Sequence, residues 1–471
     1  MGSRKAFQLI KAGKVDFVDL RFIDVRGVWQ HMSIVARDVT PASCEKGFGF
    51  DGSSIKGFCE IEESDMLLKP DLATLFLDPF FERTLVCICD VYEPNGKAFE
   101  RDPRYTARKA EEYIKKSGIG TVSYWGPELE FFVFDHVRAH LSPYRSYMEI
   151  GSAEIPGDLG AGTFSDDKRD GYTMLPKSAY FPTPPFDKLQ TFRSEMVRIL
   201  ENIDVTIEVH HHEVATGGQV EIDMRYDSLV RMADKVMKYK YVARNLAKRY
   251  GMHACFLPKP IFGDNGSGMH THQSIFKGSK NVLYDPKGYA ELSKTALSYT
   301  AGLLSNIRPL LAITNPTLNS YRRLVPHFEA PTSVAFSKRN RSAAVRIPMY
   351  FTGDEKAKRL ELRVPDPTTN PYLSFAAQLV YGVEGVKKNL SPERLGFGPF
   401  DENIWHRKGK VQQTPGSLEE TLDALRKDSV LAKSGVFAES LLTAYINLKS
   451  DEMRLQLLYP NPADFWFSND L

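Results

Sequence analysis

The chain has 471 residues, of which 42% are hydrophobic and 25% are charged, and its formal net charge at pH 7 is +2. This composition is typical of a globular protein with a substantial core, and the small net charge gives no reason to expect nucleic acid or a membrane surface as a partner. The sequence shows no signal peptide and no apolar run of about 18 residues, and its five cysteines lack metal-finger spacing. These features predict a cytoplasmic protein.

The first part of the chain predicts a small β-rich domain. Residues 15–24 alternate between apolar and polar side chains and return, after a glycine turn, through residues 28–34, which favours a β-hairpin. A loop rich in glycine and hydroxyl groups occupies residues 50–57, and a further strand is expected at residues 84–90.

Strands and helices alternate along the rest of the chain. We therefore divide the sequence into an N-terminal domain of residues 1–104 and a larger domain of residues 105–471. Apolar spacings of three and four residues predict helices at residues 105–116, 189–203, 229–250, 289–304, 372–386, 417–425 and 438–453. The intervening strands carry polar groups on one face and apolar groups on the other, which indicates a curved antiparallel sheet. A Gly-, Pro- and Ser-rich passage, residues 141–185, predicts a long loop.

Four strand candidates gather ligand-type side chains on one face, because residues two apart on a strand share a face. The four sets are Glu128 and Glu130; Glu221 and Asp223; His270, His272 and Ser274; and Arg359, Glu361 and Arg363. One such strand alone is more often an ordinary amphipathic strand with a solvated face. Four together favour a common site, since gathered carboxylates are costly unless a cation lies among them. These ligand types suit Mg²⁺ or Mn²⁺.

Further arginines, Arg323, Arg341 and Arg346, accompany these strands. Divalent cations that bridge phosphates, together with guanidinium groups that neutralise the transferred group, are the usual equipment of phosphoryl transfer. For a single residue such as Arg322, an exposed salt bridge is the simpler interpretation. The set as a whole predicts an enzyme that transfers a phosphoryl group.

Five motifs resemble those of type I glutamine synthetase. In chain order they are residues 50–55, 126–132, 211–216, 259–270 and 340–342. The resemblance implies a small N-terminal β-grasp domain and a large catalytic domain with a curved antiparallel sheet flanked by helices, in a homo-dodecamer of two stacked six-membered rings. It also implies a reaction in which ATP, glutamate and ammonia give glutamine, ADP and phosphate through γ-glutamyl phosphate.

Position by position, the resemblance implies a role for each site residue. One divalent cation would be held by Glu130, Glu213 and Glu221, and a second by Glu128, His270 and Glu361. The nucleotide would contact Glu208, Tyr226, His272, Ser274, Arg346, Lys356 and Arg359, and glutamate would contact Asn265, Gly266, Arg323 and Arg363. Arg341 and Arg363 would stabilise the transferred phosphoryl group, Glu329 would lie on a flap over the intermediate, and Asp51 of a neighbouring subunit would take a proton from ammonium.

Some positions limit or depart from this pattern. His210 and His212 are not expected to bind metal, although they stand beside a predicted ligand. His327 occupies a position where glycine is common at the base of the flap, and its role is left open. Trp405 stands where adenylylated members have a tyrosine; because an indole offers no phenol oxygen, we expect no adenylylation there.

Two alternatives remain for the activity. One is a γ-glutamyl ligase that uses a polyamine or another amine, and the other is a catalytically silent relative. The intact Asp51 loop and Tyr180 favour ammonium, because a small polar and anionic pocket suits a small cation. A silent relative would have lost metal ligands, whereas all six are present.

Overall fold

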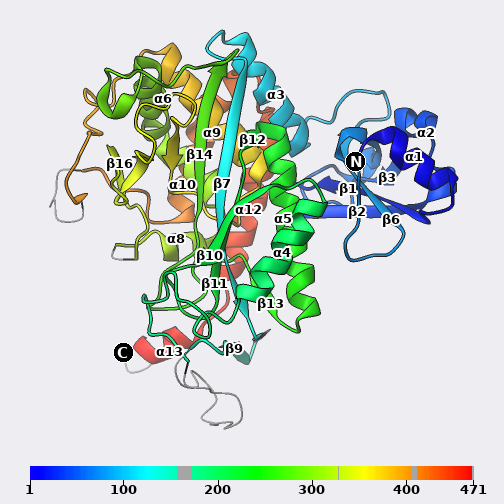
Figure 1. Cartoon of the computed structure of the whole chain (residues 1–471), viewed down its shortest axis with the longest axis horizontal. Coiled ribbons are helices and arrows are strands. Elements are labelled where there is room, and N and C mark those ends of the chain that lie inside the picture. Colours follow the sequence, from blue (N-terminus) through cyan, green and yellow to red (C-terminus); the bar gives the residue numbers. More distant parts are fainter. Residues whose placement is uncertain (156–171, 327, 405–410, 469–471) are drawn as a thin grey trace.

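The computed structural model describes residues 1–155, 172–326, 328–404 and 411–468. The N-terminal part is built on a six-stranded sheet with two short helices (Figure 1). Its elements are α1 (Ser3–Lys11), β1 (Phe17–Ile23), β2 (Trp29–Val35), α2 (Pro41–Lys46), β3 (Phe48–Asp51), β4 (Asp65–Pro70), β5 (Phe76–Leu77) and β6 (Thr84–Tyr92). The predicted hairpin is confirmed, because β1 pairs antiparallel with β2. The other neighbour of β1 is β6, which runs parallel to it.

A ten-stranded sheet forms the centre of the larger part of the chain. Seven of its strands follow the order β10-β11-β7-β14-β18-β17-β16, while β12 and β13 also pair with β7 and β15 pairs with β14. Its strands are β7 (Val122–Phe134), β10 (Ile207–His212), β11 (Gln219–Met224), β12 (Asp227–Ser228), β13 (His253–Cys255), β14 (Met269–Lys277), β15 (Lys280–Asn281), β16 (Ser333–Lys338), β17 (Ala343–Ile347) and β18 (Leu360–Leu362). The predicted antiparallel sheet is confirmed, with the exception that β16 and β17 run parallel.

The larger part of the chain also contains helices, some of which pack on the apolar face of this sheet. They are α3 (Pro103–Lys116), α4 (Gln190–Asn202), α5 (Leu229–Arg249), α6 (Lys294–Ser305), α7 (Ile307–Thr314), α8 (Leu318–Arg323), α9 (Pro371–Lys387), α10 (Leu418–Lys427), α11 (Val430–Lys433), α12 (Glu439–Leu457) and α13 (Pro462–Ser468). Trp125 of β7 stacks on Phe375 of α9, and Phe131 packs edge-on against Tyr239 of α5. The opposite, polar face of β7 is thereby left free for a site.

The prediction of one helix over residues 289–304 is wrong at its start. A short 3-10 turn, Tyr289–Glu291, comes first, and α6 begins only at Lys294. Ala290 and Glu291 adopt positive φ angles of 51° and 58°, which a right-handed helix cannot include. The Ser293 side chain then caps α6 by accepting a hydrogen bond from the Ala296 backbone N–H.

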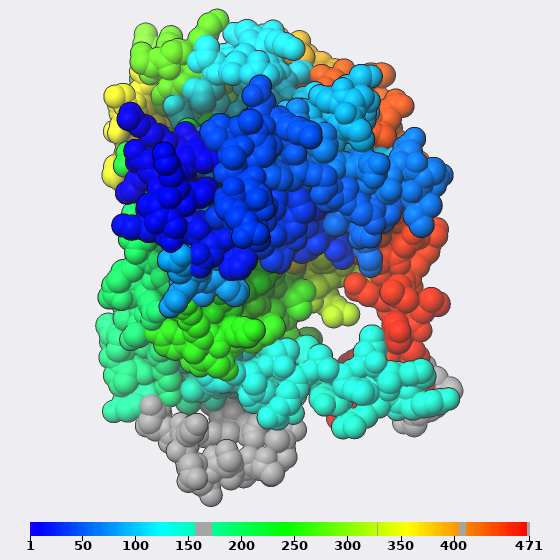
Figure 2. All heavy atoms as spheres, turned by 90° about the vertical axis from the view of Figure 1, so that its right-hand side faces the viewer, coloured from blue at the N-terminus to red at the C-terminus, as the bar shows by residue number. Residues whose placement is uncertain are grey.

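The predicted long loop contains a hairpin. Strands β8 (His136–Ser142) and β9 (Arg145–Gly151) pair with each other around a two-residue turn. Cross-strand contacts stabilise them, because Arg138 forms an ion pair with Glu149 and His140 stacks on Tyr147. The loop prediction, which began at residue 141, is therefore wrong for the end of β8 and for β9. Figure 2 shows the hairpin at the same end of the molecule as the C-terminal segment.

Within the described part of the chain, no helix is long and apolar enough to cross a membrane.

Candidate active site

A polar cavity of about 280 Å³ opens on the polar face of the sheet. The sequence-predicted residues that line it are Glu128, Glu130, Glu213, Glu221, Asn265, Gly266, His270, Arg323, Glu329, Arg341, Arg346, Arg359, Glu361 and Arg363. A second cavity of about 380 Å³ adjoins it and shares Glu128, Asp223 and Arg359. The remaining predicted nucleotide contacts line this second cavity: Glu208, Tyr226, His272, Ser274 and Lys356.

Strand register places the acidic and imidazole groups together. His270 of β14 lies directly opposite Glu128 of β7, and Glu130 of β7 lies opposite Glu221 of β11. On the other side of β14, His272 lies opposite Glu361 of β18. Since cross-strand neighbours have Cβ atoms about 4.5–5.5 Å apart, the ladder alone gathers these residues.

One side of the main cavity, which we call the arginine wall, consists of Arg341, Arg346, Glu361 and Arg363. Arg346 donates to Glu361, and the Arg363 Nε–H donates to the same carboxylate at 3.1 Å. Burial and Glu128 oppose ionisation of Glu361, but His272, Arg363 and Arg346 hold its pKa below the usual value. Arg363 also donates to the backbone carbonyl of Arg341. The carboxylate of this wall is thus paired with two guanidinium groups, and the wall as a whole carries positive charge.

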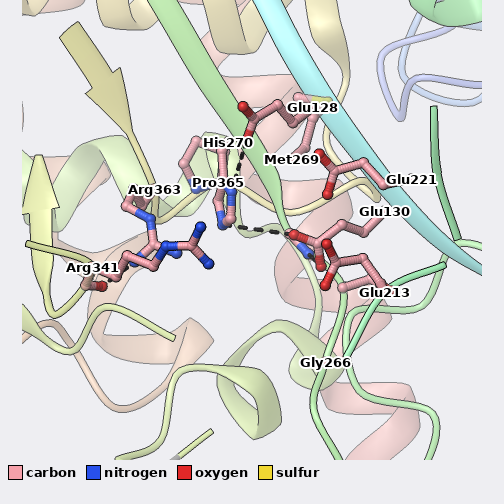
Figure 3. Close-up of polar contacts among 12 residues, drawn as sticks. Glu128, Glu130, Glu213, Glu221, Gly266, Met269, His270, Arg341, Arg363 and Pro365 are labelled. Carbon is pink, nitrogen blue, oxygen red and sulfur yellow. Dashed lines mark hydrogen bonds and ion pairs between the residues drawn. The ribbon is translucent and has the colours of Figure 1, made fainter. Parts of the chain in front are cut away.

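The opposite side, which we call the acidic wall, consists of Glu130, Glu213, Glu221 and Asp223. Figure 3 shows three of these carboxylates across from Arg341 and Arg363, with His270 between the two groups. Among the described residues, the only ion-pair partner of Glu213 and of Glu221 is His211, at 3.6 and 3.8 Å. Burial lowers the pKa of His211, which favours its neutral form. The acidic wall therefore has no cation of its own close to these two glutamates.

Crowding of carboxylates raises pKa values along the acidic wall. Burial and the neighbouring Glu130 raise the pKa of Glu213 to about 8, and burial and Glu128 raise the pKa of Asp223 to about 7. Burial and Asp223 raise the pKa of Glu221 well above its usual value. Carboxylates in this condition take up either protons or a metal ion.

The side chains fit divalent cations. Three groups each offer ligand atoms within 4.8 Å of one another: His211, Glu213 and Glu221; Glu128, His272 and Glu361; and Glu128, Glu221 and Asp223. Oxygen-rich sets with one imidazole suit Mg²⁺ or Mn²⁺. These groups include His211 and His272 in addition to the predicted ligands, so the two predicted ligand sets stay predictions.

Glu128 joins the two cavities. His272 Nε2 lies 2.6 Å from one of its oxygens, and His270 Nδ1 lies 3.2 Å from the other. The Arg359 Nε–H donates to His272 Nδ1 at 3.1 Å, which makes His272 Nε2 the protonated nitrogen that faces Glu128. Burial opposes ionisation of Glu128, but His272 and His270 hold its pKa well below the usual value.

The two other histidines of the β10 strand are engaged elsewhere. His212 Nε2 contacts the buried carboxylate of Glu154 at 2.8 Å, and His210 Nδ1 accepts from Arg193 at 3.3 Å. His211, which the sequence analysis did not assign, lines the main cavity opposite Glu221 in the ladder. The signal that could have found it is its spacing of two from Glu213 along one strand face.

Asp51 lies apart from both cavities. It ends β3, is exposed, and accepts hydrogen bonds from the Ser53 backbone N–H and from the hydroxyls of Ser53 and Ser54. These bonds lower its pKa. The action of Asp51 in a neighbouring subunit stays a prediction. The predictions made for His327 and Trp405 also stay open, because both positions lie outside the described residues.

Known proteins match the whole chain. The family model "Glutamine synthetase, beta-Grasp domain" matches residues 14–94, and "Glutamine synthetase, catalytic domain" matches residues 100–467. A glutamine synthetase of Aquifex aeolicus is 46% identical over 469 residues, which is 98% of this chain and 97% of the relative. A 3-hydroxylaminophenol mutase of Cupriavidus pinatubonensis is 44% identical over 465 residues, 97% of each chain. The solved glutamine synthetase of Plasmodium falciparum has a TM-score of 0.91 at 28% identity, over 99% of each chain.

Proposed function

The chain belongs to the glutamine synthetase family and catalyses the ATP-dependent synthesis of glutamine from glutamate and ammonia, and we propose that its two adjoining cavities divide the substrates between them. ATP occupies the cavity with Glu208, Tyr226 and Lys356, and glutamate occupies the one with Asn265 and Arg323. The observation that carries this assignment is the junction at Glu128. There the cavities meet between an acidic wall and an arginine wall.

Two or more divalent cations, Mg²⁺ or Mn²⁺, are part of the proposal. Glu130, Glu213 and Glu221 hold one, and Glu128, His270 and Glu361 hold the other, with His211 and His272 close by. When bound, such cations neutralise phosphate oxygens and let the carboxylates of the acidic wall ionise.

The chain's own residues position and stabilise the reacting groups. Arg323 ends α8, is buried, and donates to the backbone carbonyls of Val364 and Pro365, so its guanidinium is fixed beside the glutamate pocket. A γ-carboxylate oxygen of glutamate forms a bond to the γ-phosphorus of ATP while the bond from that phosphorus to ADP breaks. Arg341 and Arg363 stabilise the charge that develops on the transferred phosphoryl group.

Ammonia completes the reaction. Asp51 of a neighbouring subunit takes a proton from ammonium, and neutral ammonia then attacks the acyl carbon of γ-glutamyl phosphate, from which phosphate leaves. Glu329, at the rim of the main cavity, lies over the intermediate. Exclusion of water there protects the acyl phosphate from hydrolysis.

A homo-dodecamer of two stacked rings is the proposed assembly. One support is the position of Asp51, which lies apart from the two cavities described above. Another is exposed apolar side chains in two segments, where Trp466 of α13 is 85% exposed and Tyr144 of the β8–β9 turn is 99% exposed. Patches of this kind mark protein contacts.

The choice of amine is tested by product formation from ammonium and from a panel of polyamines and small alkylamines, with Mg²⁺ or Mn²⁺ present. We expect glutamine from ammonium at the highest rate. Turnover of a diamine without glutamine formation would show that the amine substrate is not ammonia. Absence of any product would indicate a catalytically silent relative.

The shared site is tested by mixing two inactive variants, Asp51→Asn and Glu361→Gln, before assembly. Each variant keeps the group that the other lacks. Random mixing in a ring with sites between neighbours restores about a quarter of the wild-type activity, because one site in four receives both intact halves. Sites confined to one subunit would recover nothing.

A further inference from the structure

Phe328 lies beside two lysine ammonium groups at the edge of the main cavity. Lys259 Nζ lies 3.7 Å from the centroid of its ring, and Lys177 Nζ lies 4.0 Å from it. Both distances are well inside the range of about 6 Å over which a ring face attracts a cation. Phe328 lines the cavity and directly precedes Glu329.

The two lysines are held by the backbone around the glutamate pocket. The ammonium group of Lys259 donates to the Asp264 carbonyl, and the Lys259 backbone exchanges hydrogen bonds with the Asn319 side chain at 2.7 and 2.9 Å. The Lys177 backbone N–H donates to the Asp264 carboxylate at 3.0 Å. Asp264 therefore fixes both lysines.

Asp264 also joins the lysines to the substrate-binding loops. It is 1% exposed, and its second carboxylate oxygen accepts from the backbone and the hydroxyl of Thr216, at 2.8 and 2.6 Å. Thr216 lies in the turn that follows Glu213, and Asn265 follows Asp264 directly. Phe328 is thus connected, through the lysines and one buried carboxylate, to both ends of the glutamate cavity.

The charges around Lys259 have both signs. Burial lowers the pKa of Lys259 to about 8, with Asp264 opposing the change and Lys177 and Arg323 adding to it. The negative face of the Phe328 ring attracts both ammonium groups. Each of the two cation–π contacts therefore favours the observed position of the ring.

We propose that Lys177 and Lys259 are positioning residues that clasp the Phe328 ring and so hold Glu329 over the γ-glutamyl site. This inference rests on the proposed function, because the group it protects is the acyl phosphate. When the clasp is open, water attacks the acyl carbon, the acyl–oxygen bond to phosphate breaks, and glutamate and phosphate form. ATP is then consumed without glutamine being made.

The test is the ratio of ADP to glutamine formed by Phe328→Leu and Lys259→Met at saturating glutamate and limiting ammonium. We expect a ratio of about one for the wild-type enzyme. For each variant the ratio should rise above one, because loss of the acyl phosphate to water becomes about threefold to tenfold faster, the span that cation–π contacts provide. Phe328→Trp and Lys259→Arg keep the ring face and the cation, and they should keep the wild-type ratio.

A matched control is Lys387→Met. Lys387 Nζ lies 4.4 Å from the Tyr113 ring, in α9 and α3, and neither residue lines the cavities. Loss of that contact should leave the ratio unchanged. Unchanged ratios in Phe328→Leu and Lys259→Met, in an enzyme that makes glutamine, would overturn the clasp alone. A wild-type chain that makes no glutamine would instead overturn the proposed function.

Discussion

The arginine wall and the acidic wall of one cavity both bury charge, but only at the arginine wall does a buried carboxylate have guanidinium partners. Glu361 lies between Arg346 and Arg363, and its pKa is lowered. In the part of the chain that the structure describes, the ion-pair partner of Glu213 and Glu221 is a histidine whose burial favours the neutral form, and the pKa values of both glutamates are raised. The carboxylate of the arginine wall therefore has positively charged partners, whereas the carboxylates of the acidic wall lack them. This difference indicates that cations bind at the acidic wall.

This difference means that removing a carboxylate has opposite effects on stability at the two walls. At the arginine wall it leaves unpaired guanidinium groups, whereas at the acidic wall it relieves repulsion. Loss of activity is expected in both cases, because both carboxylates are proposed metal ligands. Stability measured without metal therefore separates the two walls where activity cannot.

Glu361→Gln should have the largest effect. We expect glutamine formation to fall by about 10²- to 10³-fold, because the nucleotide-side cation loses a ligand and the arginines lose their orientation. The free energy of unfolding should fall by about 3 kcal/mol, since a buried pair loses one partner. Steady-state assays and urea unfolding measure the two quantities. Near-normal ATP turnover would contradict the ligand assignment.

Glu221→Gln should lose activity to a similar extent with the opposite change in stability. Without metal, and at a pH above its raised pKa, the free energy of unfolding should rise by about 1 kcal/mol, because a buried carboxylate no longer has to ionise beside its acidic neighbours. Urea unfolding in the presence of a chelator provides the measurement. A destabilised Glu221→Gln protein would mean that the acidic wall is already balanced.

Metal addition should affect stability in a pH-dependent way. The folded-state pKa values of Glu213 and Asp223 are raised to about 8 and about 7. A raised pKa contributes stability below the ordinary carboxyl value, and that stability is lost as the pH rises through the folded-state pKa. The metal-free protein should therefore lose stability between about pH 5 and pH 8.

Mn²⁺ or Mg²⁺ should reverse this loss, so the rise in Tm on metal addition should be larger at pH 8 than at pH 6. Binding near pH 7 should also release protons, which calorimetry in buffers of different ionisation enthalpy detects. A rise in Tm that is equal at both pH values would show that the acidic wall is already ionised without metal.

Tyr180→Phe should give the smallest effect. Tyr180 lines the main cavity and its hydroxyl interacts with Arg341. Loss of one hydrogen bond of about 1 kcal/mol predicts an increase of about fivefold in KM for ammonium, with little change in stability. Unchanged kinetics would place the ammonium pocket away from this hydroxyl.

Much of this site can be predicted from the sequence, because side chains along a strand alternate between its two faces. The shared faces of Glu128 and Glu130, and of Arg359 and Arg363, need no knowledge of which strands are neighbours. The position of His211 opposite Glu221 depends on the strand register, which the turn between them sets, and it was missed.

Contacts between distant segments are harder to predict. Phe328, Lys177 and Lys259 come from three separate parts of the chain, and no local pattern brings them together. The interrupted helix start at Ala290 was also missed, since apolar spacing continues through backbone that is not helical.

Under the proposed assembly, the exposed position of Asp51 would make activity depend on the concentration of the protein. A folded subunit in isolation would contain both cavities and every predicted metal ligand, while its own Asp51 lies apart from both cavities. Dilution below the dissociation point of the rings would abolish glutamine formation while each subunit stays folded. A cell that makes this chain slowly would therefore gain the activity abruptly, once enough subunits have accumulated to close a ring.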